Sequence, residues 1–162
     1  MIARRILDQP RGMLYTVAGL SLLAALIHLW VMPEHFQEWW GYGTFFLVAA
    51  VAQIIYAPLL LRWPTRTIVL LGIAGNSAIV LLYLFTRVLG IPFFGPEAGK
   101  IEDVGIIDVC ATMSEAAIVV ALGALLLWRL AGERNALFGL SLSAVLLVLA
   151  HLPHLLLLLA LL

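Results

Sequence analysis

The sequence predicts an all-α integral membrane protein, a bundle of five transmembrane helices with a cytoplasmic N-terminus and an external C-terminus. Three observations carry this prediction: composition, five apolar segments of membrane-spanning length, and an uneven distribution of Lys and Arg. Of 162 residues, 64% are hydrophobic and 11% are charged, and the mean hydropathy is +1.12. Soluble domains have about 25% charged residues, so we expect most of the surface to face lipid.

The same composition excludes other classes of protein. The chain has no basic patch of the kind that binds nucleic acid. Its one cysteine, Cys110, rules out an internal disulfide and a Cys-based metal framework. Residues 1–162 are therefore expected to form a single transmembrane domain.

Five apolar segments are each close to the ~20 residues that cross a lipid hydrocarbon layer. They cover residues 13–32, 43–61, 67–88, 104–128 and 137–162. Helix-breaking or polar residues separate them: Pro33 follows the first, Pro64 the second and Gly90 the third, and residues 132–135 divide the fourth from the fifth. The first segment is read as a retained span, because no small-x-small cleavage site follows it.

Basic residues orient the chain, because Lys and Arg are retained on the cytoplasmic side of a membrane. Seven of the nine lie on the side of the N-terminus: Arg4, Arg5, Arg11, Arg62, Arg66, Arg129 and Arg134. The opposite side has mostly acids, together with the other two cations: Glu34, Glu38, Arg87, Glu97, Lys100, Glu102 and Asp103. This asymmetry predicts a multi-pass protein of the plasma (inner) membrane.

The orientation gives each polar residue within a span a depth. At 1.5 Å per residue, the polar groups nearest the external boundary lie roughly 5 to 10 Å below it: His28, Asp108, His151 and His154. A deeper set lies about 13 to 16 Å below: Gln53, Asn76 and Glu115. The inner half has no ionisable residue apart from the Arg residues at its edge. Since ionisable residues in membranes normally face the bundle interior and pair, we expect a polar cluster in the outer half.

The residue types in this cluster suit a transition metal. Imidazole and carboxylate together bind Zn, Fe and Cu, and His151 and His154 are spaced i, i+3 so that one helix face presents both. The expected metal ligands are His28, Asp108, Glu115, His151 and His154. Residues at the mouth of the site or supporting its ligands are Glu34, His35, Gln53, Asn76, Tyr83, Arg87 and Thr112.

Two alternatives compete with a bound metal ion. A b-type haem would need two facing histidines, such as His28 and His151, but it would leave His154 without a role. A cofactor-free accessory or assembly subunit would use the same polar residues to hold helices together or to contact a larger membrane complex or a second copy. An ion carrier is disfavoured, because no polar track continues to the cytoplasmic half.

No catalytic nucleophile arrangement is evident. The loop 91–105 could serve as a lid, a mouth for cations or a docking surface.

Overall fold

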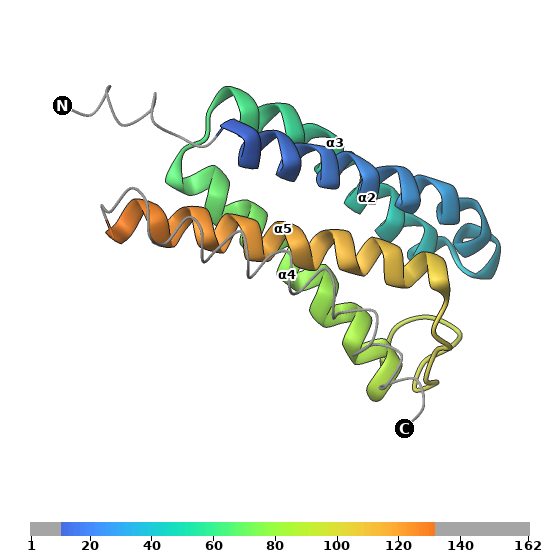
Figure 1. Ribbon diagram of the computed structural model, residues 1–162. Coiled ribbons are helices and arrows are strands. Elements are labelled where there is room, and N and C mark those ends of the chain that lie inside the picture. The colour runs from blue at the N-terminus through green and yellow to red at the C-terminus, as the bar shows by residue number, and fades with distance from the viewer. Residues whose placement is uncertain (1–10, 132–162) are drawn as a thin grey trace.

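The structure is a computed structural model that describes residues 11–131, and these residues form four helices (Figure 1). The helices are α2 (Arg11–Glu38), α3 (Trp40–Arg62), α4 (Arg66–Val88) and α5 (Ile106–Ala131). Each is long and apolar enough to cross a membrane. The prediction of an all-α bundle of apolar spans is confirmed for this part of the chain. The predicted fifth span, 137–162, lies outside the described residues, and so do His151 and His154.

Helix α2 is longer than the sequence predicts. We expected it to end at residue 32, before Pro33, but it continues to Glu38 with Pro33 inside it. A proline removes one backbone hydrogen bond, which helices in membranes tolerate when neighbouring groups compensate. After Pro33, His35 Nδ1 donates to the carbonyl oxygen of Val31 at 2.9 Å, and its ring lies 4.1 Å from that of Phe46 on α3. These contacts hold the last turn of α2 against α3.

The other three helices differ from the predicted ranges by at most three residues at each end, and α4 ends at residue 88 as predicted. Helix α3 begins three residues earlier than expected, since only Trp39 separates it from α2. Helix α4 begins after Thr65, whose hydroxyl oxygen accepts a hydrogen bond from the backbone N–H of Ile68, the usual role of a threonine cap. Helix α5 begins two residues later than expected and ends three residues later.

Residues 89–105 connect α4 to α5 without a regular helix. Three glycines in this connection have positive φ: Gly90, Gly95 and Gly99. At Gly90, with φ of 68°, a Cβ atom would lie 2.6 Å from the carbonyl oxygen of Lys100. Both the backbone conformation and this close approach require glycine there. The loop therefore folds back on itself at the end of α4.

Helix α2 packs against α3 and α5, and α4 packs against α5 with little contact to α3. Figure 1 shows α4 crossing α5, with its C-terminal end lying away from α2 and α3. Small side chains let α2, α3 and α5 approach closely, as is usual for helices in membranes. The buried alanines of these three helices are Ala18, Ala24, Ala25, Ala49, Ala50, Ala57, Ala111, Ala117 and Ala121.

The two ends of the bundle differ in chemistry. The end containing the N-terminus of α2 and the C-terminus of α5 has an apolar core that includes Leu14, Val17, Leu60, Val69, Ile118, Leu122 and Leu125. Four arginines also lie there, and one of them, Arg129, donates to the carbonyl oxygen of Pro64 at 2.9 Å. The opposite end carries the 89–105 loop, and His28 and Glu115 lie closer to this end than to the arginines. Three other buried polar residues, Ser21, Gln53 and Asn76, lie nearer the middle of their helices, so the described residues divide only in part into an apolar and a polar half.

Candidate ligand pocket at the loop end of the bundle

A buried carboxylate joins three helices toward the loop end of the bundle. Glu115 on α5 is fully buried, and its Oε1 lies 2.8 Å from His28 Nε2 on α2. The same oxygen accepts a hydrogen bond from Gln53 Nε2 on α3 at 3.0 Å. Because Oε1 is the acceptor for Gln53, we assign His28 Nε2 as the second donor to it. One carboxylate oxygen therefore links α2 and α3 to α5.

His28 and Glu115 lie at the same distance from the loop end of the bundle. His28 lies ten residues before the end of α2, and Glu115 lies nine residues after the start of α5. At 1.5 Å per residue, both lie about 14 to 15 Å from the loop end of their antiparallel helices. The sequence-based depths placed His28 well above Glu115, because Pro33 was read as the end of the first span. Counted from the observed end of α2 at Glu38, the two residues lie at one level.

A second layer of hydrogen bonds positions Gln53. Ser21 on α2 donates from its hydroxyl to the backbone carbonyl oxygen of Gln53 at 2.9 Å, and both residues are buried. Ser21 lies one heptad before His28, so the same face of α2 contacts both the backbone of α3 and the carboxylate of α5. These contacts fix how α2 and α3 are rotated about their own axes relative to Glu115.

Three buried atoms of this group have no hydrogen-bond partner among the residues that the structure describes: His28 Nδ1, Gln53 Oε1 and Glu115 Oε2. Unpaired buried polar atoms are rare, and each calls for a partner such as water, an ion or another part of the chain. In a neutral ring whose Nε2 donates to the carboxylate, Nδ1 would carry the free lone pair. It is then able to accept a hydrogen bond or bind a metal ion.

Arg87 forms a separate ionic cluster nearer the loop. Its Nη2 lies 2.9 Å from Asp108 Oδ2 at the start of α5, and its Nη1 pairs with Glu102 in the loop. The guanidinium also lies 4.7 Å from the centre of the Tyr83 ring. Asp108 thus pairs with Arg87 and is not joined to the His28–Glu115 pair. The contacts of the described residues therefore do not support Asp108 as a metal ligand.

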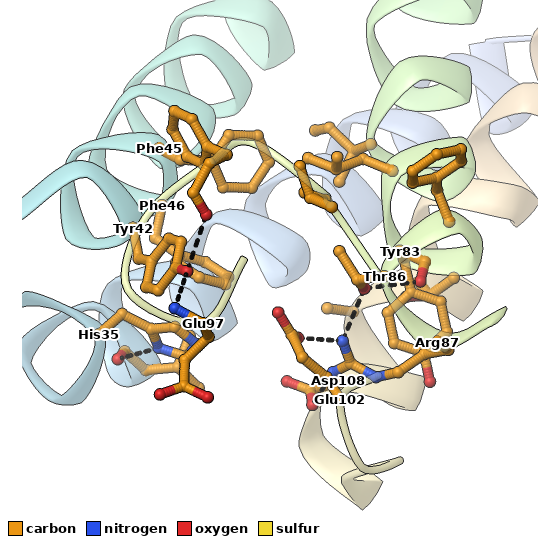
Figure 2. A pocket seen from close by; sticks show the side chains of 18 of the residues that line it. His35, Tyr42, Phe45, Phe46, Tyr83, Thr86, Arg87, Glu97, Glu102 and Asp108 are labelled. Atoms are coloured by element: carbon orange, nitrogen blue, oxygen red, sulfur yellow. Dashed lines mark hydrogen bonds and ion pairs between the residues drawn. The ribbon is translucent and has the colours of Figure 1, made fainter. Parts of the chain in front are cut away.

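A pocket of about 750 Å³ lies between the two clusters. Its lining includes His28 and Glu115, and also Arg87, Asp108 and Thr112. Figure 2 shows His35, Tyr42, Phe45 and Phe46 on one side, and Tyr83, Thr86 and Arg87 on the other. Five elements build this pocket: α2, α3, α4, the 89–105 loop and the first turns of α5.

The loop is held over this pocket from both sides. On one side, Tyr42 donates from its hydroxyl to the carbonyl oxygen of Phe94 at 3.0 Å, and the rings of Trp39 and Phe94 meet edge to face at 4.9 Å. On the other side, the backbone N–H of Glu102 donates to the carbonyl oxygen of Thr86 at 3.2 Å. Contacts to α3 and to α4 thereby position the loop.

The remaining predicted residues are dispersed. Asn76 is buried, but its amide nitrogen donates to the carbonyl oxygen of Gly72 within α4. Glu34 is exposed on α2 and is not among the pocket residues. Among residues 11–131, no three His, Cys, Asp or Glu side chains come close enough together to hold a metal ion. Among the five expected metal ligands, His28 and Glu115 are the pair that the structure brings into contact within the described residues.

Sequence reasoning missed the aromatic lining of the pocket. It assigned no role to Phe45 or Phe46, which both line the pocket. The spacing of Tyr42, Phe45 and Phe46 on one helix (i, i+3 and i+4) would have indicated a shared face. Nothing in the spacing indicates what that face contacts.

Comparison with known proteins finds no matching family model, curated protein or solved structure.

Proposed function

We propose that this chain is a small multi-pass protein of the plasma (inner) membrane, with a fifth helix over residues 137–162 and the pocket on the external side. The arginines at the opposite end of the described helices support this orientation, because basic residues are retained in the cytoplasm. A reporter fused after Leu162 is expected to be external, and one inserted between Arg62 and Arg66 cytoplasmic. A cytoplasmic C-terminus would contradict the proposed topology.

Within this topology, we propose that the outer half binds a transition metal ion, Zn, Cu or Fe, with His28 as a ligand. The observation that carries the proposal is the state of the imidazole: Nε2 is held by Glu115, and Nδ1 is buried with no partner among the described residues. Metal-binding histidines commonly donate their other ring nitrogen to a carboxylate, which orients the ring and raises its basicity. Glu115 would then orient His28, and His151 and His154 would supply further ligands.

Metal analysis and a visible absorption spectrum of the purified protein test this proposal. We expect near-stoichiometric metal in the protein and loss of most of it in His28→Ala, His151→Ala and His154→Ala, because each removes a ligand. Leu152→Ala is the matched control, since position 152 lies about 100° around a helix from residue 151. A Soret band would assign haem in place of a bare ion. Stoichiometric metal in the double variant His151→Ala, His154→Ala would contradict the proposal.

A cofactor-free accessory or assembly subunit is the second candidate. The observation that favours it is the central position of Glu115, which joins α2, α3 and α5 as a structural polar cluster would. Protein that contains neither metal nor haem, and that co-purifies with a larger membrane complex or a second copy, would favour this function over the first.

A further inference from the structure

The pocket is much larger than a metal ion needs. Its volume of about 750 Å³ lies within the range of roughly 300–1,000 Å³ that is typical of small-molecule sites. One water molecule in the liquid takes about 30 Å³, so a hydrated ion would fill only a small part of the space. The size points to an organic ligand of drug-like dimensions.

The walls of this pocket are largely apolar and aromatic. Seven of the described residues that line it are Phe or Tyr: Tyr42, Phe45, Phe46, Tyr83, Phe85, Phe93 and Phe94. Phe93 is 85% exposed, so the lining reaches the protein surface at this end. Aromatic faces carry negative electrostatic potential and bind organic cations such as quaternary ammonium groups.

Acidic residues outnumber basic ones around the same space. The described lining includes six carboxyl groups: Glu38, Glu97, Glu102, Asp103, Asp108 and Glu115. It includes two cations, and both are already paired, Arg87 with Asp108 and Glu102, and Lys100 with Glu97. A cavity lined by charges of one sign concentrates ligands of the opposite sign. The excess of carboxylates therefore favours a cationic ligand and opposes an anionic one.

The inner end of the pocket has a further acceptor. Glu115 is fully buried, lines the pocket, and has Oε2 without a hydrogen-bond partner among the described residues. A buried carboxylate in a membrane-spanning segment commonly serves as the counter-ion of a charged ligand. The unpartnered oxygen is thus a second observation, independent of the acidic rim, that points to a cation.

We propose that this pocket binds a lipophilic organic cation, a molecule with an apolar body and one quaternary or protonated nitrogen or an equivalent onium centre. The aromatic walls contact the apolar body, and the rim carboxylates with Glu115 balance the charge. This inference goes beyond the proposed metal site and requires neither a metal ion nor the helix of residues 137–162.

Equilibrium dialysis of the full chain in detergent with tetraphenylphosphonium, against matched micelles without protein, tests the proposal. The protein is first treated with a chelator, so that the result is independent of any bound metal. We expect saturable binding of tetraphenylphosphonium above the micelle background, weakened by added salt because the rim charges are screened. The anion of the same shape, tetraphenylborate, is expected to show no saturable binding. Absence of saturable tetraphenylphosphonium binding, or equal binding of the anion, would overturn the proposal.

Two matched pairs of variants locate the binding site. Asp103→Asn removes a charge from the rim and is expected to weaken binding about two- to fivefold, whereas Glu34→Gln removes an exposed charge outside the pocket and leaves binding unchanged. Phe45→Leu removes a ring from the wall and is expected to weaken binding about two- to fivefold, whereas Trp30→Leu removes a ring that is 77% exposed and outside the pocket. Equal effects within both pairs would show that the cation binds elsewhere.

Discussion

Glu115→Leu is expected to lower the free energy of unfolding by about 2–4 kcal/mol, because the change leaves two buried donors without an acceptor. These donors are His28 Nε2 and Gln53 Nε2, which both contact Glu115 Oε1. Glu115→Gln keeps an amide oxygen at the same position and is expected to cost about half as much or less. The unfolding midpoint of purified protein in detergent, measured on heating or with added denaturing detergent, compares the variants.

Ser114→Ala is the control for this prediction. Ser114 is the neighbour of Glu115 on α5, but its hydroxyl donates to the carbonyl oxygen of Cys110 within the same helix. Removing the hydroxyl breaks only this hydrogen bond within α5, so we expect a change of at most about 1 kcal/mol. If Glu115→Leu and Glu115→Gln have the same midpoint as Ser114→Ala, the carboxylate does not join the three helices.

Arg87→Ala is expected to lower the free energy of unfolding by about 1–3 kcal/mol and to release the 89–105 loop. The guanidinium connects α4 to the loop through Glu102 and to α5 through Asp108, and its side chain is only 13% exposed. Its removal leaves the two carboxylates facing each other without a cation. Limited proteolysis should therefore cleave the loop faster in this variant, and the unfolding midpoint should fall.

Lys100→Ala is the matched control, because it also removes a cation near the loop. Lys100 is 67% exposed and pairs with Glu97 three residues away. Exposed ion pairs of this kind contribute about 0–1 kcal/mol. Arg87→Lys keeps the charge but loses the planar pair of donors. Its loop cleavage rate and unfolding midpoint should therefore lie between those of Arg87→Ala and Lys100→Ala. Equal cleavage rates in Arg87→Ala and Lys100→Ala would show that Arg87 does not hold the loop.

The contacts around Glu115 and Arg87 divide the polar residues into two groups with separate roles. The group of Ser21, His28, Gln53 and Glu115 sets the packing of α2, α3 and α5. The group of Arg87, Glu102 and Asp108 sets the position of the loop. The pocket lies between the two groups, so a ligand in it would contact residues that hold the helices together and residues that hold the loop.

Much of the fold follows from local features of the sequence. Long apolar segments predict the four helices of residues 11–131, because a backbone in lipid must satisfy its own hydrogen bonds. Proline, glycine and the flanking charges predict most helix ends within three residues. Positions of polar residues along the spans also predict that they gather in one half of the bundle. Each of these predictions depends on a residue's neighbours in the chain.

The partners of each polar residue depend on tertiary structure. Whether Asp108 on α5 joins His28 on α2 or Arg87 on α4 is decided by how these three helices pack against one another. Pro33 shows the same point, because the packing of His35 on Phe46 extends α2 past a residue that locally favours its end. The sequence by itself therefore determined a bundle of apolar helices long enough to cross a membrane. Only the packing of the helices decided that His28 meets Glu115, because that pairing depends on distances between residues far apart in the chain.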